Sequence, residues 1–178
     1  PRTGTLPSLR ATLENPTDLV LLPGRAGIFV EGEFVGETDM PAVAGRGEFE
    51  LFLGVEPRID VVRQPVVRNR STTGLFGGGR LVTLANRIDL ENRLPRPVIV
   101  ELWDRRPVSR DEAIQVTLDQ PSRPLDQDAD YVEKDLPRGL LRWTIALGAA
   151  GTAEARTSVT WTVKIAHSDD VETTPIPD

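Results

Sequence analysis

The sequence predicts an all-β protein, an antiparallel β-sandwich that is immunoglobulin-like in its C-terminal half and carries a protruding long β-hairpin. Short segments alternate strictly between apolar and polar residues, which buries one face of a strand and leaves the other in water. Turn formers separate these segments, because the 178 residues include 15 Gly and 15 Pro. Short, closely spaced strands with dense turns are typical of a sandwich or barrel.

The clearest strands lie at the C-terminal end, in "LLRWTIAL" (140–147) and "TSVTWTVKI" (157–165). Each contains four alternating apolar residues, and the Gly- and Ala-rich stretch between them predicts a hairpin. Trp143 and Trp161 fall on the apolar faces, so we expect both in the core with their N–H groups bonded to backbone. Further strands are expected at 9–14, 20–22, 26–30, 33–36, 48–53, 59–68, 81–90, 98–103 and 113–118.

Two local patterns test this interpretation. Ser109 and Glu112 have the spacing of a helix capping box, but the residues that follow, Ile114, Val116 and Leu118, alternate and favour a strand. The pair Glu31-Gly32 between apolar segments predicts a tight hairpin. The stretch 121–139 lacks an apolar period and is expected to be a long exposed loop.

The chain is expected to form one domain over residues 1–166, followed by a loose acidic tail at 167–178. No internal repeat is evident. The sequence starts at Pro1 without a signal peptide pattern, which favours a fragment of a larger protein and leans towards a cytoplasmic one, although the compartment stays open.

Composition excludes several function classes. A net charge of -6 argues against nucleic-acid binding, which needs a basic surface. No run approaches the roughly 20 apolar residues of a membrane helix. The absence of Cys excludes disulfides and thiolate metal sites.

No catalytic residues and no cofactor are predicted. The single histidine, His167, follows the last strand, and no Ser stands in a G-x-S-x-G elbow. Calcium candidates are Asp126, Asp128 and Asp130, which match the first three ligand positions of an EF-hand loop. Tyr131 replaces the Gly and Pro137 the Glu of that loop, so a solvated acidic loop is the preferred interpretation.

Two places are candidates for contact with a partner. Trp103 falls opposite the inward residues of its strand, beside Arg105 and Arg106, as an interface anchor would; the alternative is that a second layer covers it. The loop "STTGLFGGGR" (71–80) lacks the Lys-Ser/Thr of a P-loop and is expected to cap the long hairpin. Its apolar pair, Leu75 and Phe76, either tucks against the body or docks into a partner.

The order of the motifs resembles the C-terminal domain of the mucoidy inhibitor A-like family. The motifs are "NPTDLVLLPGRAGIFVEGEFVG" (15–36), "FELFLGVEPRIDVVR" (49–63), "GLFGGGR" (74–80), "NRLPRPVIVELWDRRPVSRDEAIQV" (92–116) and "GLLRWTIAL" (139–147). The resemblance implies an all-β domain of unknown function that follows an N-terminal domain and a coiled coil. Only the latter part of that domain is matched, and Arg105 stands where the family commonly has Gln.

Two functions follow as hypotheses. The first is a non-enzymatic interaction or structural module, whose partner is another protein or the missing N-terminal part of the same protein, with an oligomer as a further option. If upstream strands are missing, an uncovered sheet edge would accept strands from another chain. The alternative, which rests on the family name, is an envelope-associated protein that binds or processes polysaccharide.

Overall fold

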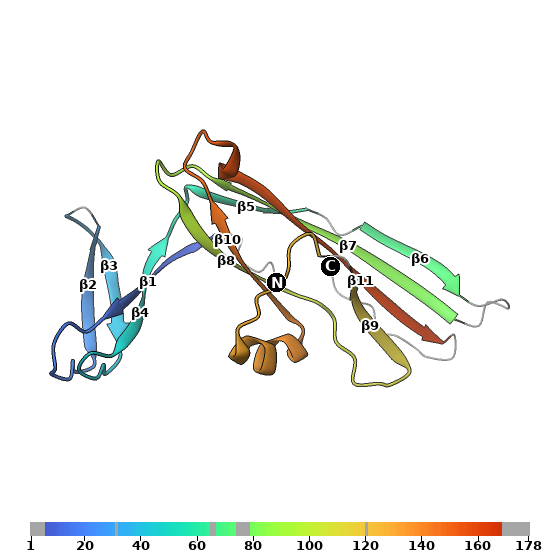
Figure 1. The fold of residues 1–178 in the computed structure, drawn as a ribbon, viewed down its shortest axis with the longest axis horizontal. Coiled ribbons are helices and arrows are strands. Elements are labelled where there is room, and N and C mark those ends of the chain that lie inside the picture. Colours follow the sequence, from blue (N-terminus) through green and yellow to red (C-terminus); the bar gives the residue numbers. More distant parts are fainter. Residues whose placement is uncertain (1–5, 31, 65–66, 74–78, 120, 169–178) are drawn as a thin grey trace. The chain divides into compact units, whose positions relative to one another are not determined.

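The structure is a computed structural model (Figure 1), and the residues that it describes are 6–30, 32–64, 67–73, 79–119 and 121–168. The chain divides into two compact units, residues 1–59 and 60–178, called unit 1 and unit 2 below. Both are built from antiparallel strands in sandwich-like arrangements, which confirms the predicted fold class. The single domain over 1–166 stays a prediction.

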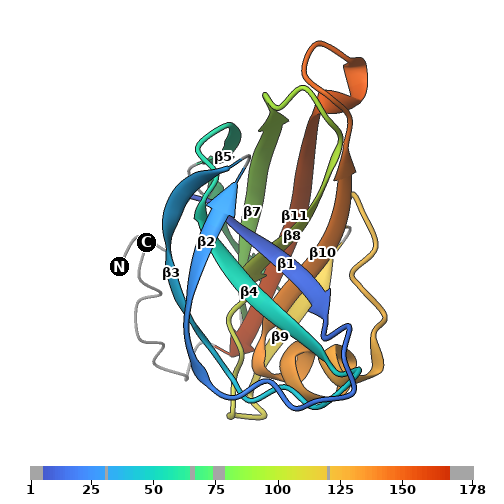
Figure 2. The same ribbon diagram turned by 90° about the vertical axis from the view of Figure 1, so that its left-hand side faces the viewer.

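Unit 1 consists of two ribbons of two strands each (Figure 2). The outer strands of the segment, β1 (Ser8–Glu14) and β4 (Glu48–Val55), pair with each other. The inner strands, β2 (Gly24–Val30) and β3 (Glu33–Met40), form the predicted hairpin, in which Gly32 has a φ of 88°. The predicted strand at 20–22 is wrong, because only Leu21 makes a bridge there, to Val43.

Unit 2 contains a five-stranded sheet and a two-stranded sheet. The larger has the order β5–β7–β11–β9, with β6 also on β7, and the smaller pairs β8 with β10. The strands are β5 (Ile59–Arg63), β6 (Val67–Thr73), β7 (Gly79–Asn92), β8 (Val98–Arg105), β9 (Ile114–Asp119), β10 (Leu140–Leu147) and β11 (Arg156–Ser168). A single turn of 3₁₀ helix, η3 (Ala153–Ala155), lies between β10 and β11.

The long hairpin differs from the prediction in its first arm. The expected arm at 59–68 is divided into β5 and β6, and the hairpin itself is β6 with β7. Because β7 also pairs with β11 from Gly79 to Glu91, this hairpin is a part of the five-stranded sheet. The predicted strand at 113–118 is confirmed as β9, which decides against a helix after Ser109.

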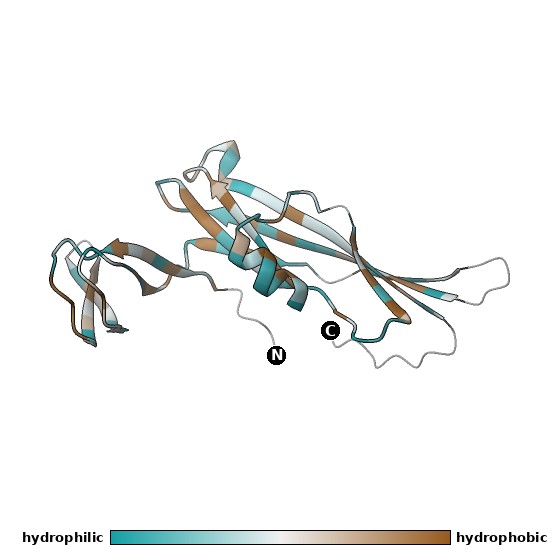
Figure 3. Cartoon of the chain, turned by 60° about the horizontal axis from the view of Figure 1, so that its bottom comes forward, coloured by the Kyte–Doolittle hydropathy of each residue, from teal (hydrophilic) through white to brown (hydrophobic). Residues whose placement is uncertain are grey.

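The core of unit 2 lies between its two sheets, and Figure 3 shows apolar and polar segments alternating along the strands. Trp143 and Trp161 are each 1% exposed, with ring centres 5.1 Å apart, as the alternation predicted. Trp143 donates to the carbonyl of Arg123 at 3.2 Å. Trp161 Nε1 has no hydrogen-bond acceptor among the described residues, contrary to expectation. The core residues are Leu84, Ile88, Leu90, Leu102, Leu141, Trp143, Ile145, Leu147, Val159, Trp161, Val163 and Ile165.

The two units share one four-strand plan, although the sequence shows no evident repeat. In each, the first and fourth strands of the plan pair, as do the second and third: β1 with β4 and β2 with β3, then β7 with β11 and β8 with β10. In each, the sequence Leu-Glu-Asn stands at the end of the first strand, at 13–15 and at 90–92, with Asn15 directly after β1. In each, the residue six positions after the Asn pairs with a residue near the end of the third strand of the plan. These pairs are Leu21 with Val43 and Val98 with Leu147.

A buried asparagine holds the corner of the plan in unit 2. Asn92 is 1% exposed, and its side-chain amide donates to the carbonyls of Arg96, at 2.8 Å, and Gly148, at 2.7 Å. Its Oδ1 accepts the N–H of Leu94 at 2.9 Å. Two of these bonds fix the loop after β7, and the third joins it to the loop after β10.

The same bonds recur in unit 1. Asn15 is fully buried and donates to the carbonyls of Leu19, at 2.7 Å, and Ala44, at 3.0 Å, while its Oδ1 accepts the N–H of Thr17 at 3.1 Å. In both units, one acceptor lies four residues after the Asn and the donor lies two residues after it. The other acceptor lies in the equivalent loop further along the chain. The two corners are therefore equivalent in topology, register and hydrogen bonding.

Candidate partner-binding surface

The outer face of the β8–β10 sheet carries the sequence-predicted anchor. Leu102 is buried, whereas Trp103 is 41% exposed and lies on the opposite face with Ile99, which is 75% exposed. Arg105 is exposed on the same face, because strand residues two apart share a face. Arg106 follows the end of β8 and is half-buried, so the structure brings together Trp103 and Arg105 but not Arg106.

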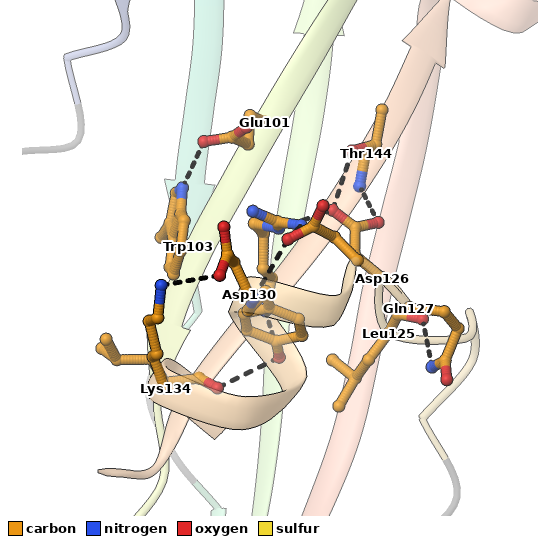
Figure 4. A network of polar contacts seen from close by, with 12 residues as sticks. Glu101, Trp103, Leu125, Asp126, Gln127, Asp130, Lys134 and Thr144 are labelled. Carbon is orange, nitrogen blue, oxygen red and sulfur yellow. Dashed lines mark hydrogen bonds and ion pairs between the residues drawn. The ribbon is translucent and has the colours of Figure 1, made fainter. Parts of the chain in front are cut away.

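Trp103 is fixed from several sides (Figure 4). Arg142 stands opposite it on β10, with its guanidinium carbon 5.4 Å from the indole centre and 4.6 Å from the ring centre of Tyr131. The Trp103 and Tyr131 rings meet edge to face at 5.9 Å. Trp103 Nε1 donates to Glu101 Oε1 at 2.6 Å. The indole therefore has a set orientation while two-fifths of it stays open to solvent.

The stretch 121–139 is not the solvated loop that the sequence predicts. It contains two short helical turns, η1 (Tyr131–Asp135) and η2 (Leu136–Arg138), and we call it the strap. Leu125 and Leu136 pack against the core, although their spacing matches neither a strand nor a regular helix.

The strap covers the edge of β10 that faces away from β8. The Tyr131 hydroxyl donates to the carbonyl of Leu140 at 3.1 Å and accepts the N–H of Arg142 at 3.0 Å. Asp126 accepts bonds from the N–H of Thr144, at 3.0 Å, and from its hydroxyl, at 2.8 Å. Burial raises the pKa of the Tyr131 hydroxyl, so it stays a donor at neutral pH. Side chains of the strap thus satisfy the backbone of an edge strand.

The three calcium candidates lie in the strap, where Arg142 pairs with both Asp126 and Asp128, the latter at 3.6 Å. Asp126 accepts the Nε of Arg142 at 2.9 Å, and Asp128 accepts the N–H of Tyr131 at 3.0 Å. Asp130 is paired with Lys134 at 2.6 Å, which lowers the pKa of its carboxyl. Among the residues that the structure describes, no cluster of three or more His, Cys, Asp or Glu side chains could hold a metal ion. Calcium binding at these residues stays untested.

Short polar side chains build the turn before β9. Ser109 Oγ accepts the N–H of Asp111 at 3.0 Å, and Asp111 Oδ1 accepts the N–H of Ala113 at 2.9 Å. Asp104, near the end of β8, points into the sandwich and accepts a bond from Arg63 of β5 at 2.8 Å. Burial raises the pKa of its carboxyl, although an N–H bond from Arg105 and the charge of Arg63 oppose this. Asp104 therefore joins the two sheets.

Two residues of the surface escape prediction from sequence. Arg142 alternates with core residues and carries no motif, yet the β8–β10 register sets it beside Trp103. Tyr131 is the only tyrosine and sits among acids, where nothing in its spacing signals burial. The other predicted contacts, Leu75 and Phe76, lie outside the described residues.

Unit 1 has an exposed aromatic pair that the sequence did not single out. Phe29 and Phe34 are 66% and 58% exposed and contact edge to face, with ring centres 5.4 Å apart. Gly27 lies beneath them, and a Cβ there would stand 3.3 Å from the Phe29 ring. The missing side chain thus lets both rings lie against the ribbon.

Residues 4–165 match the model of a protein family described as "Domain of unknown function (DUF4139)". The chain belongs to this family. Protein F37C4.5 from Caenorhabditis elegans is 28% identical to this DUF4139 chain over 154 residues, which cover 80% of the chain and 28% of the relative. The chain therefore spans less than a third of the length of that relative. No solved structure matches the chain.

The helical segments that the structure describes are too short and too polar to cross a membrane.

Proposed function

We propose that this DUF4139 chain is a non-enzymatic β-sandwich module that binds a protein partner through the outer face of β8 and β10. The observation that carries the proposal is Trp103, which is 41% exposed yet fixed by Arg142, Tyr131 and Glu101. Binding hot spots are enriched in Trp and Arg, and an aromatic that is ordered beforehand loses little entropy on binding.

The composition of this surface supports a protein partner. Exposed apolar area at Ile99 adjoins Trp103, and charge lies at the rim, at Arg105 and Lys134. Buried apolar centres with polar rims are typical of protein interfaces. The carboxylates around Trp103 are all bonded within the chain: Glu101 to Trp103 itself, Asp126 to Arg142 and Asp130 to Lys134. These bonds support a structural role for them.

We also propose that the chain is part of a protein of the mucoidy inhibitor A-like family. The motif order resembles the mucoidy inhibitor A-like family, and we propose that the chain serves there as a structural part of a longer protein or of its assembly. The match to a relative more than three times as long supports a place within a larger polypeptide.

The test is a cross-linking capture experiment in the native host. A photoreactive residue replaces Arg105, and the cross-linked protein is identified by mass spectrometry, with and without Trp103→Ala. We expect Trp103→Ala to weaken capture by at least about tenfold, since loss of an anchor costs upwards of 1 to 2 kcal/mol. Arg110→Ala, at an exposed turn position outside this face, is the matched control and should leave capture unchanged.

A glycan array with the same variants tests the alternative function, which is polysaccharide binding. The exposed Trp103 indole is also the observation that would favour a sugar-binding surface, because sugars stack on exposed aromatic rings. Array binding that disappears in Trp103→Ala, together with no captured protein, would replace the protein-binding proposal by the polysaccharide one. Capture that is equal in Trp103→Ala and wild type would show that the partner contacts another surface.

A further inference from the structure

The shared plan exposes a difference between the first strands of the two units. In unit 2, β7 is paired on both sides, with β11 on one and with β5 and β6 on the other. In unit 1, the equivalent strand β1 pairs with β4 and with no other described strand. The side of β1 away from β4, called the open edge below, is thus the place where unit 2 adds strands.

The backbone groups on the open edge can be assigned. The N–H of Asn15 donates to Gly47 O at 2.9 Å, in register with the β1–β4 ladder. Because bonding alternates along an antiparallel strand, residues 11 and 13 then bond to β4. The N–H and C=O groups of Arg10, Thr12 and Glu14 face the open edge.

These three residues are complementary to themselves under a two-fold rotation. If two β1 strands pair antiparallel with Thr12 opposite Thr12, Arg10 of each copy stands opposite Glu14 of the other. Opposite charges and Thr pairs are favourable cross-strand neighbours. On the other face, Ala11 would stand opposite Leu13, which is 42% exposed on the single chain. Pairing centred on Arg10 or on Glu14 would instead set like charges opposite each other.

We propose that two copies of the chain associate through the open edge of β1, in an antiparallel register centred on Thr12. The two β1–β4 ribbons then form one continuous four-stranded sheet across the two-fold axis. Arg10 also contacts Glu50 of β4 at 3.2 Å, which orders its side chain on the charged face. The open edge and the Trp103 surface consist of different residues. The failure of one proposal therefore does not overturn the other.

Sedimentation equilibrium of the purified chain tests the proposal, with Thr12→Pro as the main variant and Thr12→Val as its control. Proline removes an N–H that faces the open edge, so the bonds to β4 are kept; valine keeps the N–H. We expect a concentration-dependent dimer for wild type and for Thr12→Val, and dimerisation weakened by at least about tenfold for Thr12→Pro. Hydrogen exchange at Ala11 and Leu13, bonded to β4, checks that the ribbon stays folded.

Charge reversal tests the register. Arg10→Glu and Glu14→Arg should each weaken the dimer, and the double variant should restore it, because the pairs between copies are re-formed with exchanged signs. A wild-type chain that stays monomeric at all concentrations overturns the proposal and leaves the open edge to another partner. A dimer that Thr12→Pro leaves intact, or that the double charge reversal fails to restore, overturns it as well.

Discussion

The two units of the molecule follow the same plan of strands, but the first strand of the plan is buried far more deeply in unit 2 than in unit 1. In unit 2 the last leucine of the first strand, Leu90, is 2% exposed, whereas its equivalent in unit 1, Leu13, is 42% exposed. Both corners are held by a buried Asn with the same three bonds. The same turn bonds thus accompany the plan in both units, while the equivalent leucine is buried only in unit 2, which has the added strands and the Trp residues.

Spectroscopy can distinguish the units, because all three Trp lie in unit 2. Trp fluorescence during urea unfolding therefore reports on unit 2, and residue-resolved hydrogen exchange reports on unit 1.

The largest effect is expected from Trp143→Ala. This side chain is 1% exposed and packs on Trp161 between the sheets of unit 2. Its loss should lower the free energy of unfolding by about 3 to 5 kcal/mol, measured by the fluorescence of the remaining Trp in urea. A loss below about 1 kcal/mol would mean that residues other than Trp143 supply most of the stability of this core.

The pair Leu90→Ala and Leu13→Ala compares the units directly. We expect Leu90→Ala to cost about 2 to 5 kcal/mol in unit 2, because it opens a cavity in the core. Leu13→Ala should cost about 1 kcal/mol or less in unit 1, since much of that side chain is already in water. Hydrogen exchange of β7 and β1 measures the two changes. Equal losses of stability would contradict the difference in burial between Leu90 and Leu13.

The corner asparagines should behave alike. Asn92→Ala leaves the carbonyls of Arg96 and Gly148 and the N–H of Leu94 without their partner, which costs about 2 to 3 kcal/mol. Asn15→Ala removes the same set in unit 1 and should cost a similar amount. Exchange of the loop amides measures both, and a corner that tolerates alanine in one unit only would break the equivalence.

The binding of the strap to β10 should depend more on Asp126 than on Asp130. Asp126→Asn weakens the ion pair with Arg142, in which the two side chains are only 17% and 18% exposed, and two bonds from Thr144. It should cost about 1.5 to 3 kcal/mol in unit 2. Asp130→Asn, the control, removes an exposed pair with Lys134 that solvent screens, so it should leave the stability of unit 2 nearly unchanged. Urea midpoints followed by Trp fluorescence should separate the two, and equal midpoints would mean that the strap is not bound through Asp126.

The smallest effect is a dependence on pH on the outer face of unit 2. Hydrogen bonds from Arg87, then from Ser158 and Gln64, lower the pKa of Asp89 from its ordinary 3.8 to about 2. A lowered folded pKa means stability that is present above pH 4 and lost as the pH falls towards 2. The side chain is 30% exposed, so solvent screening limits the effect to less than about 1 kcal/mol.

Asp89→Asn should flatten this part of the pH profile, measured as urea midpoints at pH 7, 4 and 2.5. An unchanged profile would assign the acid sensitivity to other carboxylates.

Much of the fold could be predicted from the sequence, because strand periodicity is local. The alternation at Trp143 and Trp161 predicted their burial, and the alternation before Trp103 set it on the outer face. The strap could not be predicted, because Asp126 bonds to Thr144, 18 residues away, and no spacing signals such a contact. The bond between Asp104 and Arg63 could not be predicted for the same reason, since the two residues are 41 positions apart.

The repeat escaped detection because the units share few residues. Only Leu-Glu-Asn is common at 13–15 and 90–92, and the rest of the equivalence is in bonds to backbone atoms, which any residue supplies. Unit 2 also inserts β9 and the strap between β8 and β10, where unit 1 has a tight hairpin at Gly32. Equivalent strands are therefore separated by different lengths of sequence.

The most direct test of the incomplete cover of unit 1 is hydrogen exchange at Arg10, Thr12 and Glu14 across a dilution series, with β7 residues Arg87 and Asp89 as internal references. The account predicts that the three β1 amides are protected at high concentration and exchange quickly on dilution, while the β7 amides stay protected throughout. Protection of the β1 amides that does not change with concentration would contradict it, because the open edge would then be covered within a single chain.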